Sequence, residues 1–237
     1  MKRLKSTRVL YAGAVLTVTA VLAACASQPV APPPPKPVAV VIPPRPYPPM
    51  GASPNFVTPP VDANGVRHTV NVGLSSEETV WNLRSAYNVA ALNCTKPEHA
   101  AILAGYGAFL KNNSRTLSSI NRKLDRDYRA EHGSKYIHAR ERFQTQVYNY
   151  FAFPPTLPAF CDAVLAMSRQ VQAAPPKDLN AFAAAELPQL DSVFGEFFNS
   201  YDQYRSDLAA WEARYGAGPI TRADTPQIQG RIQGMPQ

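Results

Sequence analysis

The chain has 237 residues and a formal charge of +7, from 24 basic and 17 acidic side chains. Four of the basic residues lie in the first 24 positions, which hold no acid, so the chain from residue 25 onward carries +3. Residues 25–74 hold three more basic residues and one acid, which leaves +1 for the rest. This charge is too small for the basic footprint of a nucleic-acid-binding domain, and we expect no nucleic-acid partner.

Residues 1–24 have the pattern of a cleaved signal peptide. Basic residues up to Arg8 precede about 14 mostly apolar residues, a length short of the roughly 20 that cross a bilayer. Leu22-Ala23-Ala24-Cys25 then places small residues before a cysteine. This stretch resembles the cleavage site of bacterial lipoprotein precursors, in which the cysteine sulfur takes the lipid.

The resemblance covers residues 1–25. It implies a mature chain that begins at Cys25, whose acyl chains, palmitate among them, anchor it in a membrane. Ala26 is not the aspartate that retains such proteins at the inner membrane, so the resemblance favours the outer membrane and a domain that faces the periplasm. Two alternatives stay open: cleavage after Ala26, which also fits an A-x-A pattern and would release a secreted protein, and an uncleaved leader kept as the anchor.

Residues 25–60 are predicted to form the lipidated N-terminus and an extended spacer. Between Ala26 and Pro60, 14 of the chain's 24 prolines fall within 35 residues, which excludes a helix or an interior strand. At about 3.1 Å per residue, such a segment reaches on the order of 100 Å. It would separate the following domain from the membrane, and the alternative is a ligand for a proline-binding module.

Residues 61–74 are predicted to form a loop or a marginal hairpin, because Asn64-Gly65 lies between two valine-containing runs. The first helix then starts at Ser75, which forms a capping-box pattern with Glu78. One apolar stripe follows at helical spacing. Its members are Val80, Leu83, Tyr87, Ala90 and Cys94.

Apolar residues at helical spacing continue along the chain. A second helix of about 36 residues would follow Thr95, loosened at Gly105 and Gly107. Further helices are expected to start near Ser134, Leu157, Asp178 and Leu190, the last after a break at Pro188. We therefore predict an all-α domain over residues 75–216, an antiparallel bundle of five to six helices, and a disordered tail over residues 217–237.

Cys94 and Cys161 are an even pair once Cys25 carries lipid. Both lie on apolar stripes, and the compartment is oxidising, so we predict a disulfide between them. Closing this loop of 67 residues would stabilise the fold by about 4 kcal/mol. The alternative is two buried free thiols. The chain has no C-x-x-C, which gives no support for a redox pair or a cysteine zinc site.

A second resemblance lies within the predicted domain. The stretch Asn88-Val89-Ala90-Ala91-Leu92-Asn93-Cys94 and the later Phe160-Cys161 are similar to segments of uncharacterised helical envelope proteins of alphaproteobacteria. This resemblance implies no activity and no catalytic residues. It supports the two cysteines acting together.

The last predicted helix has an aromatic stripe. Its members are Leu190, Phe194, Phe197, Tyr201, Tyr204, Leu208, Trp211 and Tyr215. Such a stripe is most simply a seam of the core. The alternative is the lining of a pocket for an apolar ligand, which would make the protein a carrier.

Charge is divided within the domain. Residues 111–142 hold nine basic residues and four acids, whereas residues 178–212 hold seven acids and one arginine. One interpretation is that these two segments pack together and offset each other's charge. The other is a surface for an anionic partner, with Arg115, Arg122, Lys123, Arg126 and Arg129 as the candidate residues.

Catalytic motifs are absent from the sequence. It contains no G-x-S-x-G, no H-E-x-x-H and no phosphate-binding glycine loop. His68 and His99 have no catalytic context, and His132 and His138 could bind a metal only if the turn at Gly133 folded them together. We therefore expect no cofactor, no metal and no enzyme activity, with a wall or lipid hydrolase as the remote alternative.

The sequence predicts a lipid-anchored envelope protein that works as a helical interaction module. Its membrane contact is the lipid on Cys25. The expected further partner is an envelope protein, peptidoglycan or an anionic lipid.

Overall fold

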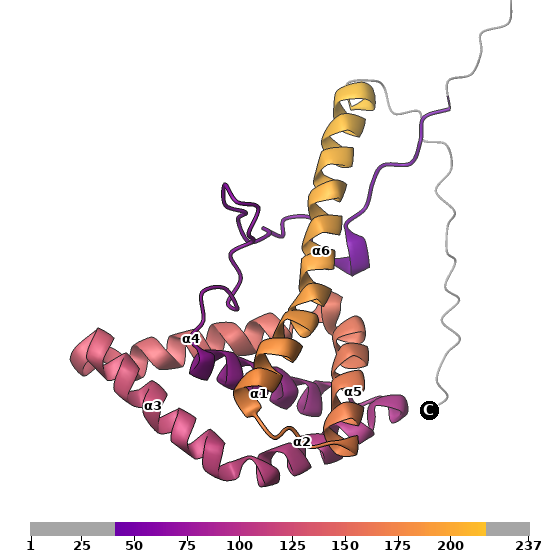
Figure 1. Ribbon diagram of the computed structural model, residues 1–237. Coiled ribbons are helices and arrows are strands. Elements are labelled where there is room, and N and C mark those ends of the chain that lie inside the picture. Colours follow the sequence, from indigo (N-terminus) through magenta and orange to yellow (C-terminus); the bar gives the residue numbers. More distant parts are fainter. Residues whose placement is uncertain (1–40, 217–237) are drawn as a thin grey trace, which may run out of the picture. The chain divides into compact units, whose positions relative to one another are not determined.

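The structure is a computed structural model that describes residues 41–216 (Figure 1). Over this range the chain is helical and holds no strand, which confirms the predicted all-α fold. The helices are α1 (Ser76–Asn93), α2 (Ala101–Asn112), α3 (Ser114–His132), α4 (Tyr136–Phe151), α5 (Leu157–Ala173) and α6 (Leu179–Tyr215). Short 3₁₀ turns lie at Pro49–Gly51, Pro97–His99, Gly133–Lys135 and Pro154–Thr156. The predicted signal peptide, Cys25, the first part of the spacer and the tail lie outside the described residues.

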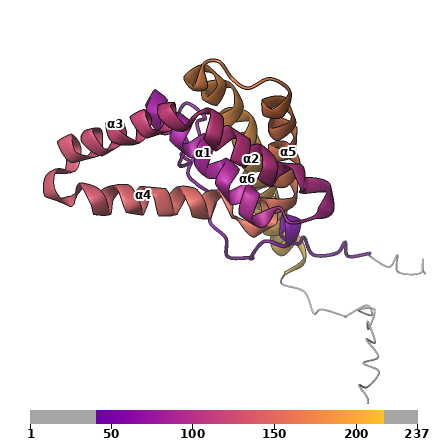
Figure 2. The same cartoon turned by 90° about the horizontal axis from the view of Figure 1, so that it is seen from below.

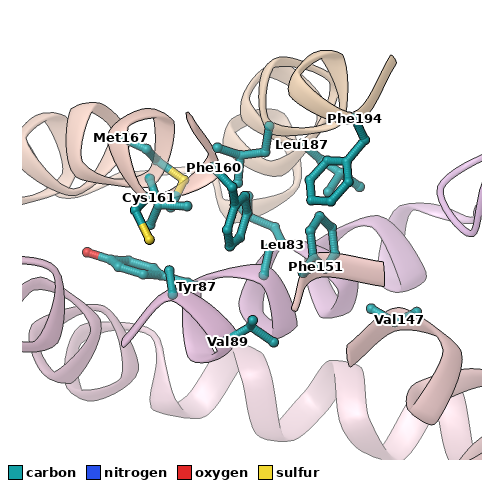
Figure 3. Packing of buried hydrophobic residues seen from close by; sticks show 14 of the residues in the cluster. Leu83, Tyr87, Val89, Val147, Phe151, Phe160, Cys161, Met167, Leu187 and Phe194 are labelled. Atoms are coloured by element: carbon teal, nitrogen blue, oxygen red, sulfur yellow. The ribbon is translucent and has the colours of Figure 1, made fainter. Parts of the chain in front are cut away.

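The central helix is α1, which packs against α2, α3, α4, α5 and α6. It begins where the capping box predicts, because the Ser75 side chain accepts a hydrogen bond from the Glu78 amide and the Glu78 side chain accepts one from the Ser75 amide. Leu83 and Tyr87 are fully buried. Figure 3 shows Leu83 of α1 close to Phe151 of α4 and Phe160 of α5, which meet in one core.

The expected single helix after Thr95 is wrong, because the chain breaks at Asn113 between α2 and α3. The Asn113 side chain donates to the Phe109 carbonyl at 2.9 Å, and its φ and ψ of −106° and 12° are not helical. Asparagine ends helices in this way because its side chain competes with the backbone for hydrogen bonds.

Gly105 does not loosen α2 but lets it approach α5. A Cβ atom at this position would lie 2.1 Å from Ser168 Oγ and 2.3 Å from Tyr87 Oη. The Tyr87 hydroxyl donates to Ser168 at 2.7 Å within the same contact. Only glycine therefore leaves room for this buried hydrogen bond between α1 and α5.

The expected break at Pro188 is also wrong, because α6 continues through it from residue 179 to 215. Proline removes one helical hydrogen bond at this point. Leu187 and Leu190 on either side are both buried in the core. Their burial on one face outweighs the lost bond and keeps the helix continuous.

The predicted pairing of Cys94 and Cys161 is confirmed, with the two sulfur atoms 2.01 Å apart. Cys94 lies at the end of α1 and Cys161 in the first turns of α5. The bond therefore ties α1 to α5.

Residues 43–74 lie against α6 for much of their length. The indole Nε1 of Trp211 donates to the Pro43 carbonyl at 2.8 Å, and the Tyr201 hydroxyl donates to the Ser53 carbonyl at 2.8 Å. Further along, Val61 and Arg67 form an isolated antiparallel bridge within a loop. The last part of the proline-rich segment, which we expected to be spacer, is therefore packed on the helical domain.

Phe56 is the main apolar contact of this segment. Its ring lies 5.0 Å from that of Phe153 and 5.2 Å from that of Tyr201, measured between centroids. It also contacts Phe197 and Phe198 of α6. The segment is therefore held by this inserted aromatic side chain as well as by its hydrogen bonds to α6.

Candidate interaction surface

Four arginines form a line along the exposed side of α3. Arg115, Arg122, Arg126 and Arg129 are spaced by 7, 4 and 3 residues, so their side chains leave the same face of the helix. The opposite face is buried and carries Leu117, Ile120 and Leu124. At a rise of roughly 1.5 Å per residue, this arginine line is about 21 Å long.

Three of these arginines have charges that no acid of the described chain offsets at close range. Within residues 41–216, no ion pair involves Arg115, Arg122 or Arg126. Arg129 lies over the ring of Tyr136 at 4.5 Å and donates to its hydroxyl at 2.6 Å. Arg129 therefore joins the last turn of α3 to the start of α4, and the other three point toward solvent.

Lys123, the fifth residue predicted for this surface, does not belong to the line. It follows Arg122 directly and so lies about 100° further round the helix. Its Nζ atom is 2.8 Å from Asp127 and 3.5 Å from Glu77 of α1. The hydrogen bond to Asp127 raises the pKa of Lys123. Lys123 links α3 to α1 instead of facing a partner.

The chain reverses between α3 and α4 at Gly133, whose φ of +56° is one that side-chain-bearing residues rarely adopt. This turn creates a hollow of about 440 Å³, which we call the tip hollow. It is lined by His132, Lys135, His138, Ala139 and Arg142, and no acidic side chain is among them. The nearest acid to His132 is Glu131, at 3.6 Å.

The turn therefore places His132 and His138 beside the same hollow. The two histidines would need this proximity to bind a metal. Within the described residues, however, no group of three or more histidine, cysteine, aspartate or glutamate side chains could hold a metal ion. Lys135 and Arg142 complete the lining with fixed positive charges. This composition suits an anion.

The α3–α4 hairpin is held together by Arg140 of α4. Its guanidinium forms an ion pair with Asp125 and a hydrogen bond with Asn121, both on α3. It also lies over the Trp81 ring of α1, 5.4 Å from the centroid. Tyr128 of α3 lies next to this contact. Its burial, together with the charge of Glu78, raises its pKa to about 12. The hairpin is thus fixed internally and against α1.

Three acidic side chains of α6 accept hydrogen bonds from the segment that precedes α1. The pairs are Asn71 with Asp191 at 2.6 Å, Arg67 with Asp202 at 2.7 Å and Arg45 with Glu212 at 2.7 Å. Across the part of the chain that the structure describes, no ion pair joins residues 111–142 to residues 178–212. The interpretation in which these two segments offset each other therefore gains no support.

The aromatic stripe of α6 lies in the core as far as Tyr204. Phe194, Phe197 and Tyr201 are fully buried. The ring of Phe194 stacks on Tyr150 of α4 with the centroids 4.3 Å apart. The space beside these rings is filled by other aromatic side chains, among them Phe56, in place of a ligand pocket.

The remaining histidine contacts lie apart from the hairpin tip. The Nε2 atom of buried His99 is 2.7 Å from Asp162, and His68 is 3.3 Å from Asp62 within its loop. Among the hydrogen bonds of residues 41–216, none joins a histidine to a serine or cysteine side chain, as a nucleophile would need.

No single helix in the described range is long and apolar enough to cross a membrane. One bent pair, Ser114–Phe151 with Pro154–Ala173, meets that criterion only when the two parts are taken together. Comparisons with known protein families, with curated protein sequences and with solved structures give no match.

Proposed function

We propose that this protein is a membrane-anchored envelope lipoprotein whose helical domain is a non-enzymatic interaction module. In this proposal, lipid on Cys25 attaches the chain to the outer membrane and the domain faces the periplasm. The α3–α4 hairpin is the surface that contacts an anionic partner.

The arginine line carries the proposal. Arg115, Arg122 and Arg126 share one exposed face, and no ion pair within residues 41–216 involves them. Like charges along one side of a helix repel one another, so they do not stabilise a helix that serves only in packing. A partner with negative charge would relieve this repulsion.

The placement of the hairpin adds support. Figure 2 shows α3 and α4 extending side by side away from α2, α5 and α6, with their connection at the far end. Arg140 and Asp125 hold the two helices together. The hairpin therefore presents its charges on a preformed surface, which lowers the entropy cost of binding.

Carriage of an apolar ligand by the aromatic stripe is less well supported. Phe197 and Tyr201 already contact Phe56. A ligand at this position would first have to displace that ring.

The contact surface can be tested by photo-crosslinking in living cells. Ser119 lies on the exposed side of α3 between Arg115 and Arg122, and exposed Ala166 on α5 is a matched control. We expect a photoreactive benzoylphenylalanine in place of Ser119 to give a discrete adduct that the same residue in place of Ala166 does not give. Equal yields from both positions, or no adduct from either, would contradict the proposed surface.

The anchor is tested separately by labelled palmitate. We expect incorporation in the native chain and none in Cys25→Ala. Incorporation that persists in the variant would contradict lipidation at this cysteine.

A further inference from the structure

The tip of the hairpin adds two features to the arginine line on which the proposed function rests. The tip hollow is lined only by basic side chains and Ala139. The arginine line runs along α3 to the same end, where Arg129 meets Tyr136. Between Tyr136 and His138 lies Ile137, a large apolar side chain that is 50% exposed.

We propose that the hairpin tip docks on the surface of an anionic membrane, with a lipid phosphate in the tip hollow. This deepens the proposed function by naming the class of its anionic partner, and it rests on that function. Lys135 and Arg142 supply the charges for the phosphate oxygens, and His132 and His138 supply further hydrogen-bond donors. The arginine line contacts the headgroups of the lipids next to the one in the tip hollow.

The exposed side chain of Ile137 favours a lipid surface over other polyanions as the partner. An isolated apolar side chain surrounded by cations suits the boundary between headgroups and acyl chains, where apolar burial and charge attraction act together. A nucleic acid offers no such apolar layer, and the chain from residue 75 carries only +1 in total, with this local cluster included. The tip therefore fits a bilayer better than a purely ionic polymer.

Because the proposed anchor already holds the domain near a bilayer, a weak contact between the hairpin tip and the lipid surface is sufficient for docking. A lipid-bearing Cys25 would hold the domain within the reach of its linker above a bilayer, so that docking becomes an intramolecular step at high effective concentration. A few basic residues then suffice, since each lysine or arginine near an anionic surface strengthens binding by about fivefold.

The test uses the full chain carrying Cys25→Ala, so that lipid on this cysteine cannot attach it to vesicles. Co-sedimentation is compared between vesicles of phosphatidylcholine alone and vesicles of phosphatidylcholine and phosphatidylglycerol in equal parts. We expect binding to the anionic vesicles to be at least tenfold tighter and to weaken with added salt. A leader retained on the chain holds four basic residues and would itself favour anionic vesicles, so the contribution of the hairpin is measured by comparing variants that all carry the same leader.

Paired variants locate the contact. Lys135→Gln with Arg142→Gln should weaken binding to the anionic vesicles by about 25-fold, from about fivefold for each charge. Ile137→Ser, which changes no charge, should weaken it by several-fold. Arg169→Gln with Arg205→Gln removes two exposed charges from α5 and α6 and should leave binding within twofold of the native chain. All five positions are exposed, so circular dichroism should show unchanged helix content.

Three outcomes would overturn the inference. The first is equal binding to neutral and anionic vesicles, and the second is an equal loss in the control pair. The third is binding of inorganic phosphate in solution, detected by calorimetry, without preference for anionic vesicles, which would make the hollow a site for free phosphate. If any of these occurs while the Ser119 crosslink persists in cells, the membrane is the wrong partner and the interaction surface stands. Loss of the crosslink as well would remove the proposed function.

Discussion

The guanidinium of Arg140 in α4 forms an ion pair with the carboxylate of Asp125 in α3, across the inside of the hairpin. The Arg140 side chain is only 12% exposed, and it lies over the Trp81 ring of α1. This contact holds the arginine line and the tip hollow in a fixed relation. The candidate surface therefore depends on a residue that does not face the partner.

Replacing Arg140 should loosen the hairpin. Arg140→Leu leaves Asp125 and Asn121 without their donor, and we expect the free energy of unfolding to fall by about 1–3 kcal/mol. The loss stays below that of a fully buried pair because the Asp125 side chain is 43% exposed. Urea denaturation measures the change, and hydrogen exchange should rise in α3 and α4. Arg142→Leu, on the exposed side, should change stability by less than about 0.5 kcal/mol; a similar loss in both variants would contradict this role of Arg140.

Two glycines on opposite sides of α2, two residues and so about 200° apart around the helix, should respond in opposite ways. Gly105→Ala places a Cβ atom against Ser168 and Tyr87 and should destabilise the protein by about 1–3 kcal/mol. Gly107→Ala meets nothing within 4 Å and should be neutral or stabilising, since alanine favours the helix. Thermal unfolding of the two variants measures the difference. Equal effects would mean that α2 and α5 do not approach each other at Gly105.

The segment before α1 should depend on Phe56. Phe56→Ala removes a ring packed among Phe153, Phe197 and Tyr201, and we expect a loss of about 2–3 kcal/mol in stability. Limited proteolysis should then cut within residues 43–60 before the helices unfold. Val57→Ala is the control, because this side chain is 77% exposed. Resistance of this segment in the Phe56 variant would show that polar contacts to α6 alone hold it.

Stability should fall at high pH through Tyr150. Burial, with the charge of Asp191 adding to it, raises the pKa of this phenol. The folded protein therefore keeps a proton that the unfolded chain releases near pH 10, so the stabilisation is complete below about pH 10 and is lost as the pH rises further. Tyr150→Phe should be about 1–3 kcal/mol less stable at neutral pH, because it loses the bond to Asp191, but its stability should fall less steeply above about pH 10.

Urea unfolding at a series of pH values measures both quantities. Tyr47→Phe, which changes a side chain that is 79% exposed, should keep the native slope. Parallel slopes for the native chain and Tyr150→Phe would contradict the assignment to this residue.

Local sequence signals predicted the parts of the fold that depend on neighbouring residues. The Ser75–Glu78 box placed the start of α1, and the apolar positions of Cys94 and Cys161 predicted their pairing. One local signal was missed, and one feature that depends on distant packing was not predicted. Asn113 ends α2 through its own side chain, whereas burial keeps α6 intact across Pro188.

The candidate surface was predicted in part. Helical spacing alone separates Lys123 from Arg122 and Arg126, so its different role could have been found from the sequence. The tip hollow could not, because it depends on the path of the chain through Gly133. Packing of the proline-rich segment from Pro43 onward could not be predicted either, because it depends on contacts with α6, which is distant in the sequence. Proline excludes regular structure there but leaves carbonyls free to accept from Trp211 and Tyr201.

The most direct measurement of the central claim is the charge dependence of the Ser119 crosslink in living cells. With benzoylphenylalanine in place of Ser119, the adduct should form in the native background. It should fall at least tenfold in Arg122→Gln with Arg126→Gln, because two charges of the contact surface are removed. It should persist in Arg169→Gln with Arg205→Gln. An adduct of equal yield in all three backgrounds would contradict the claim that the arginine line of α3 binds an anionic partner.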